Sequence, residues 1–234
     1  MLRRTVLASA LTTAALVFAG CTSSGPAEQS AGPSAAELLA AARKTFDAAS
    51  SVSIVLTSEG VPAGVSGVTG TTGKAVISAT EPKFDGQVTG TFGGVTGNIA
   101  VRAIGEKVWA KLFTETFEPF DLASVGAPNP ARFFDPAHGL SALLTDTQKP
   151  ALGEWARVDK DVVRQVSGTL SGARVKELLV LGEDTATFSV TYGITESSHV
   201  LRTVSLTGPF YGTATSTYDI VLADYGVPVE ISAP

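Results

Sequence analysis

The residue with the most distinctive chemistry is Cys21, the only cysteine of the 234-residue chain. A single cysteine cannot form an intrachain disulfide, so its thiol is available for another modification. The small residues Ala19 and Gly20 come directly before it, and Phe18 stands where a lipobox usually has leucine. Bacterial lipidation needs an accessible thiol to take a diacylglyceryl group and small residues at which a peptidase then cuts. The spacing therefore predicts that Cys21 is acylated.

The segment before Cys21 has the layout of a signal peptide. Met1 to Arg4 is short and basic, and Thr5 to Phe18 is mostly apolar. This apolar run is shorter than the membrane-spanning length of about 20 residues and suits the hydrophobic region of a signal peptide. We therefore expect residues 1–20 to be removed and the protein to be held by lipid on the extracytoplasmic face of the cell membrane. The alternative is an ordinary secretory signal with an incidental cysteine.

Residues 21–33 are predicted to be a flexible tether. Thr22 to Pro33 is rich in Ser, Gly, Ala and Pro and carries one charge, Glu28. A segment of this composition cannot bury a core. We therefore expect the folded domain to begin at residue 34.

Two histidines, His138 and His199, are the obvious candidates for acid–base chemistry. Asp135 stands three residues before His138, so the two could form an acid–base pair. The simpler interpretation is that Asp135 caps the following helix and that His138 is exposed. His199, next to the predicted strand that starts at Val200, is expected at the surface.

The remaining motifs do not predict a catalytic, cofactor or metal site. Asp146, Asp159 and Asp161 could suggest calcium, but their spacing lacks the pattern of an EF-hand loop, and aspartate is common in turns. The chain has no Gly-x-Ser-x-Gly nucleophile motif and no phosphate-binding loop. A net charge of −5 without a basic stripe argues against nucleic-acid binding.

The residue pattern of the folded part predicts one helix at its start, followed mainly by strands. Ser34 and Glu37 form a capping box, and apolar residues then recur at helical spacing over residues 35–49. Further short helices are expected at 137–144 and 171–181. Alternating residues predict strands at 51–57, 75–80, 84–92, 95–103, 107–112, 155–160, 162–170, 185–194, 200–207 and 213–222, with a weak strand in 60–73 and an edge strand in 225–234. Without a βαβ rhythm, a mostly antiparallel sheet is expected.

Glycines interrupt several of these strands. In the strand from Phe84 to Phe92, Gly86 and Gly90 share a face with the aromatic residues. Glycine within a strand marks a bend or a close approach and leaves space beside it. That space could be left open for a ligand, or the helices could fill it while the glycines only bend the sheet. Trp109 and Trp155 are expected in the core or at a cavity rim.

Four segments together resemble one lipoprotein family. The most specific is the proline-led stretch Asn129–Leu144, with Phe133-Phe134 before Asp135-Pro136 and then Gly139-Leu140. The others are Ser53–Thr57, Val108–Leu112 and Tyr225–Val229, where family members often have tryptophan in place of Tyr225. In this order and spacing, the chain resembles the actinobacterial LppX/LprG-type lipoproteins from Cys21 to about Pro234.

The resemblance implies an α+β fold over residues 34–234, in which a single strongly curved antiparallel sheet, a half-barrel, carries helices on its concave face. Between them the family has an apolar cavity, which we expect to hold at least two acyl chains. The implied function is to carry an acylated lipid or glycolipid across the cell envelope without catalysis or cofactor, with a membrane lipid transporter as a further partner.

Two alternatives remain at this point. An accessory lipoprotein would bind a protein partner or a transporter without lipid cargo, and it would need no large cavity. A surface-tethered hydrolase would need a buried cluster of mutually bonded polar groups. The size and lining of the cavity should distinguish the lipid carrier from these two alternatives.

Overall fold

The computed structural model describes residues 32–92, 94–112 and 114–234. The predicted signal peptide and Cys21 lie outside the described residues, as does the predicted tether up to residue 31. Pro33–Pro234 forms one compact unit. Within the described part of the chain, no helix has the length and apolar character needed to cross a membrane.

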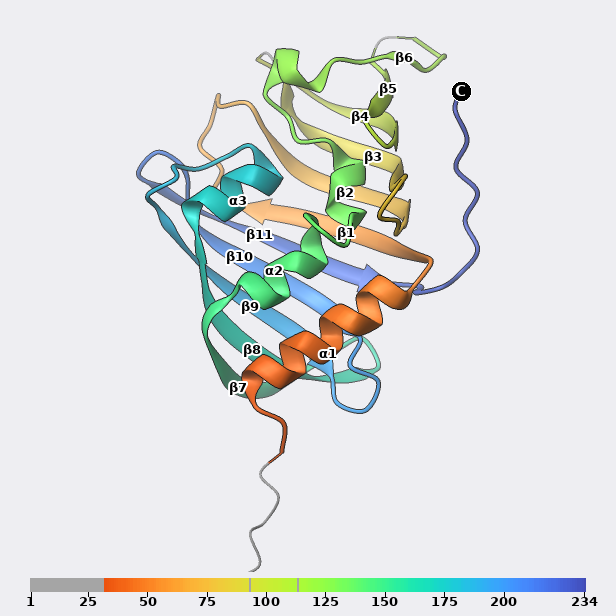
Figure 1. Ribbon diagram of the computed structural model, residues 1–234. Coiled ribbons are helices and arrows are strands. Elements are labelled where there is room, and N and C mark those ends of the chain that lie inside the picture. The colour runs from red at the N-terminus through yellow and green to blue at the C-terminus, as the bar shows by residue number, and fades with distance from the viewer. Residues whose placement is uncertain (1–31, 93, 113) are drawn as a thin grey trace, which may run out of the picture. The chain divides into compact units, whose positions relative to one another are not determined.

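A single antiparallel sheet organises this unit (Figure 1). Over the described residues it has eleven strands, in the order β6-β5-β4-β3-β2-β1-β11-β10-β9-β8-β7. Their bounds are β1 Ser51–Glu59, β2 Gly67–Val76, β3 Lys83–Phe92, β4 Val95–Ile104, β5 Lys107–Lys111, β6 Glu118–Pro119, β7 Gln148–Val158, β8 Asp161–Ser171, β9 Thr187–Thr195, β10 Leu201–Tyr211 and β11 Ala214–Ala223. Two meanders, β1–β6 and β7–β11, join where β1 pairs with β11. The sheet is not closed, since β6 and β7 form its two edges.

The first helix, α1 (Ala35–Ala48), confirms the predicted helix at 35–49. The Ser34 hydroxyl accepts a hydrogen bond from the Glu37 backbone N–H, and the Glu37 carboxylate accepts one from the Ser34 N–H at 2.8 Å. This reciprocal capping box satisfies backbone donors that the first turn leaves free. Leu39 and Phe46 are among the residues that the helix buries.

The other helices lie in the connections between the strands. Within the described residues these are the 3₁₀ helices η1 (Leu122–Val125) and η2 (Pro130–Phe134) and the α-helices α2 (Leu140–Asp146) and α3 (Gly172–Leu179). Helix α2 starts three residues later than predicted. The cause is a tight turn, in which the Gly139 N–H donates to the Asp135 carbonyl at 2.7 Å. Figure 1 shows α1, α2 and α3 on the same side of the sheet.

The prediction of a separate strand at 75–80 is wrong. A single strand, β2, takes up part of the predicted weak strand and ends at Val76. Beyond it the chain turns away from the sheet, because the Ser78 hydroxyl accepts hydrogen bonds from the Thr80 and Glu81 N–H groups. The Ser78 N–H in turn donates to the Phe134 carbonyl of η2.

The predicted edge strand at 225–234 is also wrong. No strand is assigned to these residues, which all belong to the described part of the chain. Side chains hold the segment instead of a ladder of backbone hydrogen bonds. Lys83 donates to the Ile231 carbonyl at 3.3 Å, and Arg102 donates to the Ser232 carbonyl at 3.1 Å.

Strand β7 begins seven residues before its predicted start, at Gln148. Its pairing with β8 shifts register twice, between Gln148 and Ala151 and between Leu152 and Trp155. Such bulges break the alternation of side chains on which strand prediction relies.

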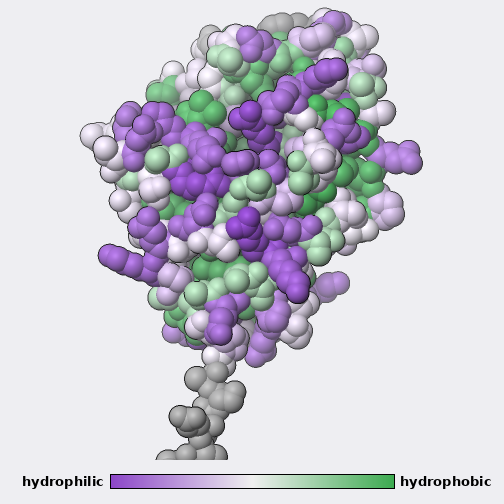
Figure 2. All heavy atoms as spheres, in the orientation of Figure 1, coloured by the Kyte–Doolittle hydropathy of each residue, from purple (hydrophilic) through white to green (hydrophobic). Residues whose placement is uncertain are grey.

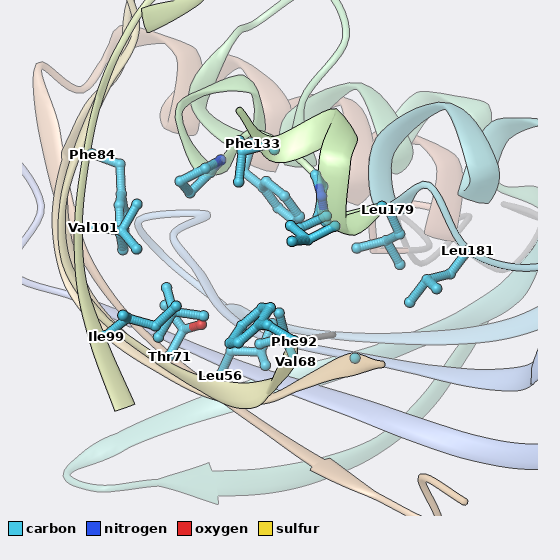
Figure 3. Close-up of a pocket in the computed structure, with 18 of the residues that line it drawn as sticks. Leu56, Val68, Thr71, Phe84, Phe92, Ile99, Val101, Phe133, Leu179 and Leu181 are labelled. Atoms are coloured by element: carbon cyan, nitrogen blue, oxygen red, sulfur yellow. The ribbon is translucent and has the colours of Figure 1, made fainter. Parts of the chain in front are cut away.

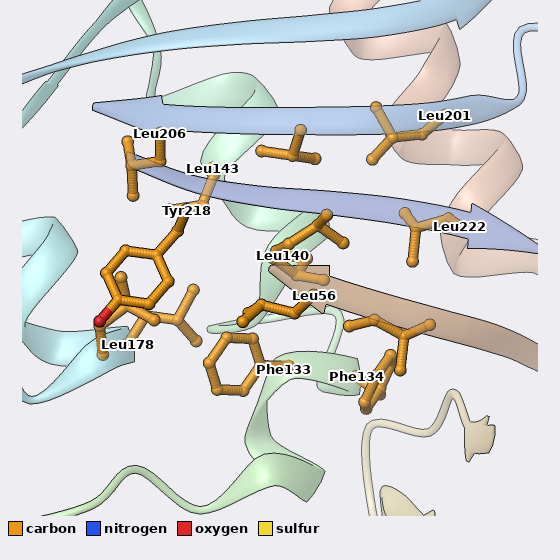
Figure 4. Close-up of a cluster of buried hydrophobic side chains, with 14 of the residues drawn as sticks. Leu56, Phe133, Phe134, Leu140, Leu143, Leu178, Leu201, Leu206, Tyr218 and Leu222 are labelled. Carbon is orange, nitrogen blue, oxygen red and sulfur yellow. The ribbon is translucent and has the colours of Figure 1, made fainter. Parts of the chain in front are cut away.

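The core lies between the helices and the inner face of the sheet (Figure 4). We define the inner face by the buried strand residues Leu56, Phe84, Val101, Val166, Tyr192, Leu206, Tyr218 and Leu222. From the opposite side Leu140 and Leu143 of α2 contribute to the same cluster. The hydroxyl of the fully buried Tyr192 lies 2.9 Å from that of Thr147 and donates to the Leu143 carbonyl at 3.1 Å. Its polar atom is therefore satisfied inside the core.

Candidate functional site

An apolar pocket of about 290 Å³ lies against the inner face of the first meander (Figure 3). One wall comes from β1 to β4, and the facing wall comes from the chain between Phe120 and Phe134. Leu179 and Leu181 lie at one end (Figure 3). The lining residues are Ile54, Leu56, Ser66, Gly67, Val68, Thr71, Phe84, Val88, Phe92, Ile99, Val101, Phe120, Leu122, Val125, Gly126, Ala127, Pro128, Pro130, Phe133, Phe134, Leu179, Leu181 and Tyr218. None of these side chains is charged.

The glycines of β2 and β3 shape one wall of the pocket. Gly73 pairs with Gly86 across the two strands. A Cβ at Gly73 would stand 2.6 Å from the Phe84 ring, and one at Gly86 would stand 2.7 Å from it. The space left by the two missing side chains is therefore filled by Phe84, whose ring stacks on Phe134 with a centroid separation of 6.4 Å.

The expectation of a cavity for two acyl chains is not confirmed. A volume of about 290 Å³ is at the lower end of the roughly 300–1,000 Å³ found for small-molecule sites. The reason is visible in the lining, which includes Phe84, Phe92, Phe120, Phe133 and Phe134. These aromatic rings take up much of the space between the sheet and the segment that faces it.

The polar groups of the lining are few. Ser66, Thr71 and Tyr218 carry the hydroxyl groups among the lining side chains. Thr71 lies in the pocket beside Ile99 (Figure 3). The Tyr218 hydroxyl lies 2.5 Å from that of Tyr211, so two phenols meet where β11 borders the pocket.

The structure does not bring the histidine candidates into a reactive pair. Asp135 accepts a hydrogen bond from the Ala137 N–H at 2.8 Å, so it stabilises the turn before α2. The exposed His138 has its Nδ1 3.2 Å from a carboxylate oxygen of Glu177. His199 is half-buried, with a positive φ of 52° in the turn between β9 and β10.

The aspartate candidates form ion pairs with arginines. Asp159 and Asp161 lie 3.2 and 3.1 Å from the Arg202 guanidinium, and Asp146 lies 2.7 Å from that of Arg174. Across the described residues, no group of three His, Cys, Asp or Glu side chains is placed to hold a metal ion.

Neither tryptophan lines the pocket. Trp155 is 47% exposed, and the Arg164 guanidinium lies 5.0 Å from the centre of its ring. The expectation of a core or rim position is therefore wrong for Trp155. Trp109 is half-buried in β5.

The individual lining residues were not predictable from the sequence. The phenylalanines of residues 114–136, where the strand pattern is interrupted, were a visible signal, since four of them fall in this segment. Tyr218 gave no such signal, because only strand pairing brings its hydroxyl next to that of Tyr211.

Over the helices, Figure 2 shows a surface made mainly of hydrophilic residues with smaller apolar patches between them. The apolar lining of the pocket thus contrasts with the surface on this side of the molecule. A polar exterior around an apolar interior space is the arrangement expected of a site for apolar ligands.

No curated protein sequence matches this chain. The crystal structure of LprF from Mycobacterium bovis is similar at a TM-score of 0.73 and 16% identity, covering 86% of this chain and 96% of that one. The lipoprotein LppX from Mycobacterium tuberculosis is similar at a TM-score of 0.62 and 16% identity, covering 85% and 98%. The model of the LppX_LprAFG lipoprotein family matches residues 34–231, and the chain therefore belongs to this family, as the four motifs predicted.

Proposed function

We propose that this lipoprotein binds the acyl part of a lipid or glycolipid in the apolar pocket and carries it across the cell envelope. The observation that carries the proposal is the pocket itself, lined by apolar side chains and by no charged one. Each acyl CH₂ removed from water contributes about 0.8 kcal/mol. A long acyl chain therefore cannot cross an aqueous gap unaided. An apolar lining of this kind avoids the free-energy cost of exposing the chain to water.

The pocket volume bears on the number of chains carried. A lipid with two or three acyl chains is larger than a drug-sized ligand. A site of about 290 Å³ therefore fits one acyl chain better than such a lipid. A cargo with several chains would require the segment from Phe120 to Phe134 to move away from the sheet, with the helices then closing a larger cavity on its concave face.

Native mass spectrometry of the full chain, purified from an actinobacterial host, tests the proposal. We expect a bound species that dissociates into protein and a lipid, and whose mass gives the number of acyl chains. If the chain carries no adduct and takes up no lipid from added vesicles, the proposal is wrong and the accessory lipoprotein without cargo is favoured.

Two neighbouring threonines of β2 provide a matched pair of variants. Thr71 lines the pocket, whereas Thr72 is exposed and lies on the opposite face of the strand. Thr71→Phe should fill the pocket and lower the lipid-bound fraction severalfold, while Thr72→Phe should leave this fraction unchanged. Equal occupancy in the two variants would mean that lipid binds elsewhere.

The anchor and the place of action belong to the same proposal. Cys21 would hold the protein on the extracytoplasmic face of the cell membrane, and the predicted tether up to residue 33 would let the folded unit reach a membrane lipid transporter.

A further inference from the structure

Two tyrosine hydroxyls meet beside the apolar pocket. Tyr218 of β11 lines the pocket and is 4% exposed, and its hydroxyl points away from the sheet in Figure 4. Tyr211, at the end of β10, is half-buried, and the two hydroxyl oxygens are 2.5 Å apart. At this distance one phenol donates its proton to the other.

This pair of hydroxyls has one more proton than its mutual hydrogen bond uses. Each phenol carries one proton and can also accept a hydrogen bond. Their mutual hydrogen bond uses one of the two protons. Within the described part of the chain, neither hydroxyl makes a second hydrogen bond. When Tyr211 is the donor, the proton of Tyr218 is therefore free for an acceptor in the pocket.

The protonation of Tyr218 suits this role. Burial, together with the hydrogen bond to Tyr211, raises the pKa of Tyr218 well above its ordinary value. The phenol therefore stays neutral at physiological pH and keeps the proton that it would donate.

The lack of charged side chains in the lining limits which ligand groups could accept a hydrogen bond from Tyr218. No Lys, Arg or His side chain borders the pocket. A carboxylate placed there would lose its hydration without gaining a cation, which is strongly unfavourable. A neutral carbonyl oxygen has a much smaller desolvation cost, and a single hydrogen bond compensates for it.

We propose that Tyr218 donates a hydrogen bond to the ester carbonyl of an acyl chain in this pocket, so that the site selects acyl esters over free fatty acids. This inference rests on the proposed function, because it names the ligand group that the same pocket recognises.

Competition binding to the full chain tests the inference, with a pyrene-labelled alkane as the displaced probe. The competitors are methyl hexadecanoate, heptadecane and hexadecanoate, at neutral pH. The wild-type protein should bind the ester roughly three- to tenfold more tightly than the alkane, as one neutral hydrogen bond allows. It should bind the carboxylate more weakly than the ester.

Two variants test whether Tyr218 is the hydrogen-bond donor. Tyr218→Phe keeps the ring and should remove the preference for the ester while leaving alkane binding unchanged, which also reports that the pocket is intact. Tyr225→Phe is the matched control, because its hydroxyl donates to the Leu201 carbonyl at 2.6 Å and does not line the pocket. The control should keep the preference.

The outcomes separate this inference from the proposed function. Equal binding of ester and alkane by the wild-type protein, or an unchanged preference in Tyr218→Phe, overturns the role of Tyr218 and leaves lipid binding intact. A loss of the preference in Thr71→Val but not in Tyr218→Phe also overturns it, since the donor is then Thr71. Failure of all three competitors to bind overturns the proposed function itself.

Discussion

Arg174 of helix α3 contacts both ends of α2, through Asp146 at its last residue and the His138 carbonyl just before its start. Its guanidinium lies 2.7 Å from the Asp146 carboxylate and 3.2 Å from that of Glu177, and it donates to the His138 carbonyl at 2.7 Å. The planar fork of an arginine can reach several acceptors at once, whereas a lysine offers a single ammonium group.

We expect Arg174→Lys to lower the free energy of unfolding by about 1–2 kcal/mol, measured by urea denaturation. The control is Arg132→Lys. Arg132 also pairs with a carboxylate, that of Glu106, but its side chain is 59% exposed. An exposed pair contributes little, so this change should stay within about 0.5 kcal/mol. Equal losses in the two variants would contradict the role assigned to Arg174.

Contacts between residues differ in how far the sequence could predict them. The capping box of Ser34 and Glu37 was predictable, because its partners are three residues apart on one helical turn. The pairing of Arg202 with Asp159 and Asp161 was not, because it depends on which strands become neighbours. The same holds for the hydroxyl pair of Tyr211 and Tyr218, and so for the phenol that Tyr218 brings to the pocket.

Among the secondary-structure elements, the pairing of β2 with β3 depends most on glycine. A Cβ at Gly86 would collide with the Thr72 carbonyl and stand 2.7 Å from both the Phe84 ring and the Gly73 Cα. Gly86→Ala should therefore destabilise the protein by about 1–3 kcal/mol, as overpacking does in other cores. Thermal unfolding followed by circular dichroism measures the loss.

Gly97 of β4 is the matched control for this prediction. It also lies within a strand, but a Cβ there would meet nothing within 4 Å. Gly97→Ala should be neutral or stabilise by about 0.4–1 kcal/mol, because alanine reduces the freedom of the unfolded chain. If Gly86→Ala were as stable as Gly97→Ala, the close approach of β2 and β3 would not limit the side chain at residue 86.

The elements themselves were predictable where the side-chain period is regular. Strands β3 and β4 were expected within one residue of their observed ends, since their residues alternate without interruption. Strand β7 was largely missed because two register shifts interrupt its alternation. After Tyr225 the error is the opposite, because a strand was predicted where the structure has none. The alternating residues of this segment suit a strand, but side chains of β3 and β4 hold it.

For the folded unit as a whole, buried tyrosines predict a loss of stability in alkali. Burial raises the pKa values of Tyr192 and Tyr225 well above the ordinary range. In the unfolded chain these phenols ionise near pH 10. Above that pH the unfolded state binds fewer protons than the folded one, so the free energy of unfolding falls as the pH rises. Below it, these phenols should add no pH dependence.

Urea denaturation at about pH 8 and about pH 11 measures this loss. Tyr192→Phe and Tyr225→Phe each remove one titrating phenol, so each variant should lose less stability between the two pH values than the wild-type protein. An unchanged difference in both variants would assign the alkaline sensitivity to other groups.

The architecture of the whole unit was predicted better than its interior. The antiparallel sheet and the three α-helices follow from periodicity and from the four family motifs. The size of the pocket does not, because it depends on how far the rings of residues such as Phe84, Phe120 and Phe133 reach into the space between the layers. Packing of this kind is set by pairs of residues distant in the sequence.

At the largest scale, we predict that the position of the protein in the cell depends on Cys21. One acyl chain gives only marginal membrane binding, whereas two or three together hold a protein stably. Cys21→Ala removes the thiol that would take these chains. The variant should therefore move from the membrane fraction into the culture fluid, while Thr22→Ala, which changes only the next residue, should stay with the membranes. Mass spectrometry of the N-terminal peptide should find Cys21 as the first residue of the wild-type protein, carrying the mass of the acyl groups. A Cys21→Ala protein that remains in the membrane fraction after a high-salt wash would show that another part of the chain, such as an uncleaved signal segment, supplies the anchor.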